Sequence, residues 1–234
     1  MKNNALLLVL FLVLQFPAPA QEKQDEKKPP ALAAKRKLTD EEQKLLDEAT
    51  TRSGNAMALL AQGKGAEAER EFRATLVIVE SVFGAEHPDT LMGRMGLATV
   101  LKAQDKNAEA EKELRAVLAI RERAMGAEHP DVLLCRKNLS SVLHDQGKHA
   151  EGEKELRAVL AIQERVLGAE HPDVFLSCYA LALCLEAQKK FPEALAFIQR
   201  AESGRQKAVG ADHPATKKAK FVREHIEAAM KDGK

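Results

Sequence analysis

The sequence contains few aromatic side chains. Among 234 residues there is one tyrosine and no tryptophan, and the aromatic residues together make up 4%. Sugar-binding sites rely on such rings for stacking, so this composition argues against a glycan-binding protein. A protein of the cell envelope that binds a glycan or small molecule is therefore retained only as an alternative.

An excess of one charge is also lacking. The chain has 36 Lys and Arg against 35 Asp and Glu, and without residues 1–20, which contain only Lys2, the numbers are 35 and 35. A balanced chain exerts no long-range attraction on nucleic acid or on anionic lipid. We therefore expect neither as a partner.

No apolar run is long enough to span a bilayer. Lys2 is followed by an apolar run over residues 5–14 and then by a small-x-small pattern that ends just before Gln21. This run of about ten to twelve residues is well short of the roughly 20 that a spanning helix needs. We predict that residues 1–20 are a cleaved signal peptide. The mature chain would begin at about Gln21 and be secreted or periplasmic, with no membrane insertion, and an uncleaved anchor is the alternative.

Cysteine is scarce, with only Cys135, Cys178 and Cys184. An odd number in an exported chain leaves at least one thiol unpaired or shared between chains. We interpret the three as small apolar side chains at helix contacts. The alternative is a bridge between Cys135 and Cys178, which occupy nearly matching positions of successive repeats and would need Cα atoms within about 7 Å.

Motifs of catalysis and cofactor binding are missing as well. The sequence has no C-x-x-C, no H-E-x-x-H and no Gly-rich phosphate loop. The cluster closest to a nucleophile with its base is Cys135 with His144 and His149. Cys135 and His144 would lie about 13 Å apart along one helix, beyond hydrogen-bond reach. We predict a protein that is not an enzyme and holds no metal or other cofactor.

A turn of the form Gly-Ala-Glu-His-Pro-Asp dominates what is present. It begins at Gly84, Gly126 and Gly168, and a variant copy begins at Gly210, so that the spacing between copies is constant. A fixed period of this size is typical of a solenoid of stacked helix pairs. We call this turn the seam. Its glycine is expected to close one helix in the left-handed conformation, and its proline to open the next.

The four seam histidines invite a metal interpretation. Successive packed helices stand about 8–10 Å apart, whereas two ligand atoms on one zinc lie only some 4 Å apart. We therefore predict that each histidine hydrogen-bonds nearby backbone in its turn.

Between the seams, each repeated row predicts a helix A and a helix B. Leu97, Leu101 and Leu114 recur at the same row positions at steps of three and four, which place them on one helical face. Residues 21–37 predict a disordered, charged spacer. The repeat domain is predicted over residues 38–234, with units at about 42–83, 84–125, 126–167 and 168–209 and a capping helix within 210–234.

The row Leu97-Ala98, Leu101, Ala110, Leu114 and Val117 resembles the tetratricopeptide repeat, and the length of the row and its seam are similar to the kinesin-light-chain variety. The resemblance implies an all-α, right-handed solenoid of antiparallel helix pairs with a C-terminal capping helix. It also implies a groove, lined by helices A, that binds peptides or proteins. In that variety an asparagine just before the Leu-Ala pair recurs from unit to unit and resembles a ladder that grips peptide backbone. Here only Asn138 occupies that position.

The groove surface implied by this resemblance consists of Met92, Met95, Thr99, Lys137, Asn138, Ser141, His144, Tyr179, Leu183 and Glu186. Met95 and Tyr179 are either adaptable binding contacts or packing between neighbouring helices. The predicted function is a non-catalytic scaffold that docks a protein or peptide in an extracytoplasmic compartment. Self-assembly of the chain through its open ends is a second alternative.

Overall fold

The computed structural model describes residues 37–232, in which there are nine α-helices and no strand. The predicted signal peptide and residues 21–36 of the predicted spacer lie outside this range. The helices are α2 (Asp40–Ala61), α3 (Gly65–Phe83), α4 (Pro88–Ala103), α5 (Asn107–Met125), α6 (Pro130–Asp145), α7 (His149–Leu167), α8 (Pro172–Ala187), α9 (Phe191–Val209) and α10 (Pro214–Asp232). The expected all-α repeat fold is confirmed. None of these helices combines the length and the apolar character that a membrane span requires.

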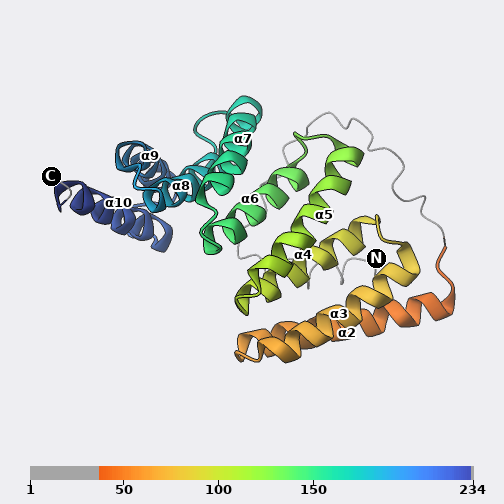
Figure 1. Ribbon diagram of the computed structural model, residues 1–234. Coiled ribbons are helices and arrows are strands. Elements are labelled where there is room, and N and C mark those ends of the chain that lie inside the picture. Colours follow the sequence, from red (N-terminus) through yellow and green to blue (C-terminus); the bar gives the residue numbers. More distant parts are fainter. Residues whose placement is uncertain (1–36, 233–234) are drawn as a thin grey trace. The chain divides into compact units, whose positions relative to one another are not determined.

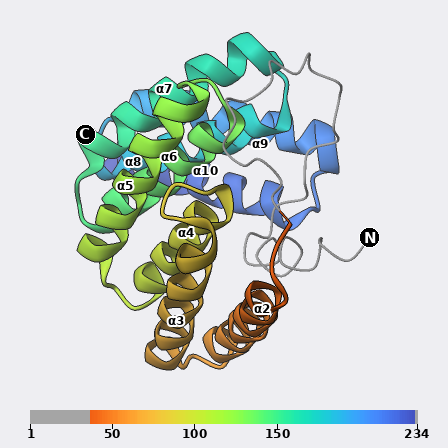
Figure 2. The same cartoon turned by 90° about the vertical axis from the view of Figure 1, so that its right-hand side faces the viewer.

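The described residues form two compact units, although the sequence predicted one repeat domain. Unit 1 ends at Val132 and unit 2 begins at Leu133. The boundary falls within the first turn of α6, at the start of the third repeat. Within unit 1, α2 packs along α3 (Figure 1, Figure 2) and α4 packs on both α3 and α5. Within unit 2, α8 packs on α7 and α9, and α9 packs on α10.

The seams have a stricter geometry than expected. Gly84, Gly126, Gly168 and Gly210 all have positive φ, from 85° to 89°. Their ψ values are near 160°, at 165° for Gly84 and 155° for Gly168, and not the value near 47° of the left-handed helix. This combination is open essentially to glycine alone.

Each seam histidine has the predicted role in its turn. His87 and His171 are the N-cap residues of α4 and α8, and the Nδ1 of each accepts the backbone N–H two residues later at 3.2 Å. His129 and His213 make the same bond. The imidazole thus satisfies one of the N–H groups that have no partner within the helix.

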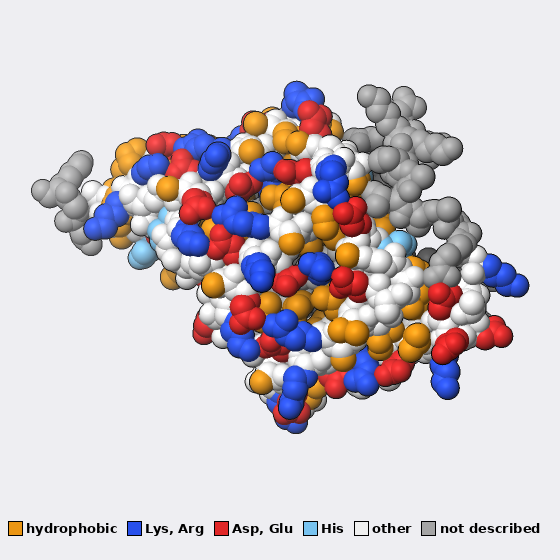
Figure 3. Space-filling model, turned by 45° about the vertical axis from the view of Figure 1, so that its right-hand side comes forward, with side chains coloured by type: hydrophobic (Ala, Val, Ile, Leu, Met, Phe, Trp, Pro, Cys, Tyr) orange, Lys and Arg blue, Asp and Glu red, His pale blue; other side chains and the backbone are white. Residues whose placement is uncertain are grey.

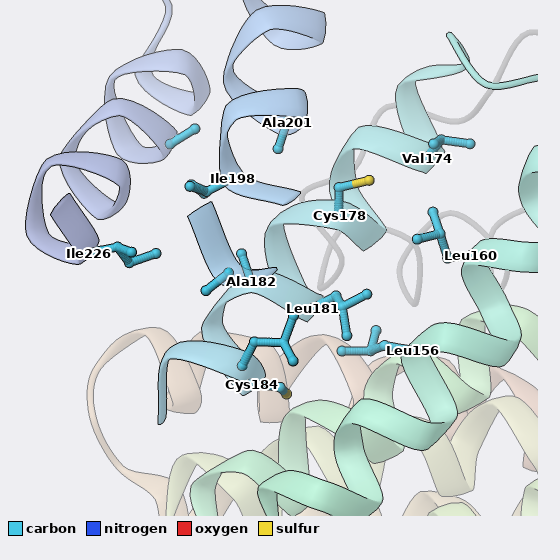
Figure 4. Packing of buried hydrophobic residues seen from close by; sticks show 13 residues of the cluster. Leu156, Leu160, Val174, Cys178, Leu181, Ala182, Cys184, Ile198, Ala201 and Ile226 are labelled. Carbon is cyan, nitrogen blue, oxygen red and sulfur yellow. The ribbon is translucent and has the colours of Figure 1, made fainter. Parts of the chain in front are cut away.

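Leucines of the repeated rows form the core. Leu97, Leu139 and Leu181, together with the leucines four residues after each, are at most 1% exposed. In unit 2, Leu181 belongs to a cluster that includes Leu156 of α7, Ile198 of α9 and Ile226 of α10 (Figure 4). Packing of helix A against helix B therefore buries the residues that the periodicity selected.

An ion pair links helix A to helix B in the first three repeats. Arg52 binds Glu71 at 3.0 Å, Arg94 lies 3.6 Å from Glu113, and Arg136 binds Glu155. In the fourth repeat the corresponding residues are Cys178 and Phe197, so a thiol and an aromatic ring occupy the two positions.

The cysteine interpretation as buried apolar residues agrees with this packing. All three thiols are buried and unbridged. Burial raises the pKa of the Cys178 thiol to about 11 and also raises that of Cys184.

A buried carboxylate joins one repeat to the next. Glu153 on α7 accepts hydrogen bonds from Arg157 on its own helix and from Gln188 and Lys190 at the following turn, at 2.7 to 2.9 Å. Glu69, at the same row position two repeats earlier, makes the equivalent bonds. Burial alone would raise the pKa of Glu153, but these donors outweigh it and lower the pKa to about 2.

Replacing this carboxylate should destabilise unit 2. We expect Glu153→Gln to lower the free energy of unfolding at neutral pH by about 1–3 kcal/mol. The folded state favours the ionised form, so the stabilisation is complete above the unfolded pKa of 4.5 and is lost as the pH falls towards 2. Urea unfolding at several pH values should therefore show the gap between wild type and variant closing over that range.

Glu170→Gln is the control for this prediction. The Glu170–Lys207 pair is exposed, with side-chain exposures of 73% and 69%, so its loss should have little effect on stability. A gap for Glu153→Gln that stayed constant down to about pH 2 would contradict the proposed electrostatic origin.

Candidate protein-binding surface

All ten predicted groove residues lie on helices A. Ser141 is exposed, Met95 is buried, and the other eight are half-buried. Met92, Met95 and Thr99 belong to unit 1 and the remainder to unit 2, so the structure defines two partial surfaces.

In unit 1, Met95 packs inside its own repeat. Its side chain is 7% exposed, and its sulfur accepts a hydrogen bond from Arg121 Nη1 at 3.0 Å. Arg121 also donates to the Asp131 carbonyl at 3.1 Å. The Thr99 hydroxyl is engaged with the Met95 carbonyl at 3.1 Å. Of the two interpretations of Met95, its burial supports packing.

In unit 2, Tyr179 occupies the position of Met95 two repeats on. The guanidinium of Arg205 lies over its ring, 4.5 Å from the centroid, and donates to the Ala215 carbonyl at 3.1 Å. Tyr179 is half-buried, so part of its ring remains accessible beside a cation. The sequence analysis missed Arg205. The sequence did contain an indication of it, because the same position of successive helices B is occupied by Arg121, Gln163 and Arg205.

Two cations of this surface form no ion pair with any residue that the structure describes. Burial lowers the pKa of Arg205 and of Lys137, with the Asp173 carboxylate partly offsetting the effect at Lys137. Within residues 37–232 neither lies in contact with a carboxylate, and Nε of Arg205 is buried without a hydrogen-bond partner. Elsewhere, acidic and basic side chains alternate over the face shown in Figure 3. Desolvated cations without a salt bridge favour the approach of an anionic group.

Glu186 and His144 have polar partners of their own. The Glu186 carboxylate contacts His225 Nδ1 on α10 at 2.5 Å. His144 Nδ1 lies 3.9 Å from the sulfur of Cys184, and its ring centroid is 4.8 Å from that of His149. The sequence analysis had grouped these histidines with Cys135, whereas helix packing brings Cys184 beside His144.

This cluster is a poor candidate for catalysis or metal binding. Cys184 is 2% exposed, and burial raises the pKa of its thiol, so the thiolate nucleophile is disfavoured. No group of three His, Cys, Asp or Glu side chains in the described part of the chain is arranged to hold a metal ion.

Solved structures of repeat proteins resemble this chain. It is similar to a crystal structure of a putative kinesin light chain from Podosopora anserina with nearly identical TPR-like repeats, at 23% identity and a TM-score of 0.68, covering 83% of this chain and 90% of that one. It is also similar to BtubC (BKLC) from P. vanneervenii, at 15% identity and a TM-score of 0.61, covering 82% and 90%. At these identities the likeness concerns the fold. No curated protein matches.

Family profiles agree with this fold. One tetratricopeptide repeat profile matches residues 91–151 and 137–207, and a second matches residues 49–89. These matches run from the first helix pair into α9 and together cover more than half of the sequence. The chain therefore belongs to the tetratricopeptide repeat family.

Proposed function

We propose that this protein is a non-catalytic scaffold that binds a protein or peptide segment outside the cytoplasm, along the surface of helices A. Tetratricopeptide repeat proteins are generally scaffolds for protein–protein interaction, which supports the proposal that this chain binds another protein. The compartment rests on the signal-peptide pattern of residues 1–20.

One observation favours the surface of unit 2 as the docking site. Tyr179 and Leu183 are half-buried apolar groups on α8, and Arg205 and Lys137 are cations that form no ion pair within residues 37–232. An extended segment that carries both apolar and acidic side chains would cover the former and neutralise the latter. Replacing the cations or the ring should therefore weaken binding without unfolding the chain.

Site-specific cross-linking tests the surface. A photoreactive amino acid at Leu183 should capture a partner in intact cells, because this position lies on the proposed surface. The same amino acid at Ala196, an exposed position on the helix B of that repeat, should not. Tyr179→Ala should reduce capture at position 183 by roughly tenfold, as for a central aromatic contact.

Equal capture from positions 183 and 196, or capture unaffected by Tyr179→Ala, would contradict a helix-A docking site.

The compartment needs its own measurement. The intact mass of the protein from an extracytoplasmic fraction should correspond to a chain that begins at about Gln21, and a chain that begins at Met1 would argue against cleavage.

A further inference from the structure

The outer face of α10 carries a large exposed apolar side chain. Phe221 is 71% exposed, whereas Ala219 and Ile226 of the same helix are fully buried. A residue turns by about 100° along an α-helix, so Phe221 lies roughly opposite the two buried residues. At this row position in earlier repeats, Met95 is in contact with Arg121 and Tyr179 with Arg205. No described residue covers Phe221 in this way.

Basic residues surround this phenylalanine. Residues 214–223 contain Lys217, Lys218, Lys220 and Arg223 and no acidic residue. Arg223 pairs with Glu202 and Glu227, whereas the lysine contacts are at exposed side chains: Lys217 lies 3.1 Å from Asp212 and Lys220 lies 3.9 Å from Glu224. The first turn of α10 has no carboxylate, because Ala215 stands where α4, α6 and α8 have an aspartate. Cations near the N-terminus of a helix oppose its dipole, so anionic groups from outside the helix would be favourable here.

The outer face of α2, the first described helix, has the opposite charge. Residues 40–48 contain five acidic residues and one lysine. Thr51 and Ala58 on this helix are exposed. At the same two positions of the later repeats and of α10, every residue is buried: Gly93, Cys135, Ser177 and Ala219 for the first, and Val100, Val142, Cys184 and Ile226 for the second. Helices α4, α8 and α10 each pack on the helix that precedes them. No described helix precedes α2 to cover the corresponding face.

We infer that α10 of one copy of this chain docks against α2 of a second copy. The contact would place Phe221 over the exposed face that contains Thr51 and Ala58, and the lysines of α10 next to the acidic residues of α2. It joins two different surfaces, so each copy keeps one of them free for a further copy. This association can be tested apart from the docking of another protein on Tyr179 and Leu183 of α8, because its contacts lie on α2 and α10.

Sedimentation of the full chain tests the contact. The weight-average mass should rise with protein concentration above that of a single chain, and should fall again at high salt, since exposed charges are screened. Phe221→Ser should weaken the association by roughly tenfold or more. Val77→Ser removes another exposed apolar side chain, 69% exposed on α3, and should change nothing.

A charge swap identifies the two surfaces. Lys217→Glu with Lys218→Glu should abolish association, and so should Glu41→Lys with Asp47→Lys. Mixing these two double variants should restore it, because the acidic α10 of one then meets the basic α2 of the other. A wild-type chain that stays monomeric at every concentration would overturn the proposal. So would association that persists in Phe221→Ser, or a mixture that fails to reassociate.

Discussion

Gly204→Ile should destabilise unit 2 by about 2–3 kcal/mol, even though isoleucine stands at this row position in the three preceding repeats. A Cβ atom added at Gly204 would lie 2.2 to 2.3 Å from atoms of the Phe175 ring, which is 4% exposed. In the second and third repeats the equivalent of Phe175 is leucine. The fourth repeat has thus exchanged a leucine–isoleucine pair for phenylalanine and glycine.

The double variant decides whether this exchange is compensatory. Phe175→Leu alone should cost about 1–2 kcal/mol, because it leaves a gap above Gly204. Phe175→Leu with Gly204→Ile should recover most of the stability, giving a coupling of about 1–3 kcal/mol between the two sites. Urea unfolding followed by circular dichroism measures all four proteins. A double variant no more stable than Gly204→Ile would show that the volumes are not complementary.

Leu181→Ala should cost about 2–5 kcal/mol, the largest expected effect of a single truncation in unit 2. Leu181 is fully buried in a cluster to which α7, α8, α9 and α10 all contribute (Figure 4), so removing three carbon atoms should leave a cavity. The same unfolding experiment reports the loss.

Leu183→Ala on the same helix is the matched control. Leu183 is half-buried, and its truncation removes much less area from contact, so we expect a cost below about 1 kcal/mol. Equal costs at positions 181 and 183 would mean that the core does not lie where the repeat rows place it.

The fold could be predicted from the sequence because the same pattern of apolar residues recurs in successive repeats. A leucine such as Leu97 recurs with constant spacing in successive rows, and this excludes a chance helical pattern. The backbone geometry of the seams was harder to predict from the sequence. The glycine at position 84 indicated a positive φ, but its ψ near 165° depends on how the chain approaches the next helix, which no local preference encodes.

Much of the candidate surface was less predictable. Arg205 reaches Tyr179 from a different helix, and Cys184 rather than Cys135 approaches His144, because contacts between helices depend on their crossing and not on spacing along one helix. Met95 and Tyr179 looked equivalent in sequence. Only the packing separates them, since the first is buried and the second half-buried.

The matched substitutions of the fourth repeat limit how this gene could recombine with itself. A crossover at the turn between helix A and helix B would join the third helix A to the fourth helix B. Arg136 would then lie opposite Phe197 in place of Glu155 and would have no ion-pair partner at that position. Leu133 would lie opposite Gly204, with an unfilled space between them. A crossover at a seam keeps every such pair together. The residues that are matched in this way therefore lie within one helix pair, and the helix pair is the smallest segment that can be exchanged without separating them.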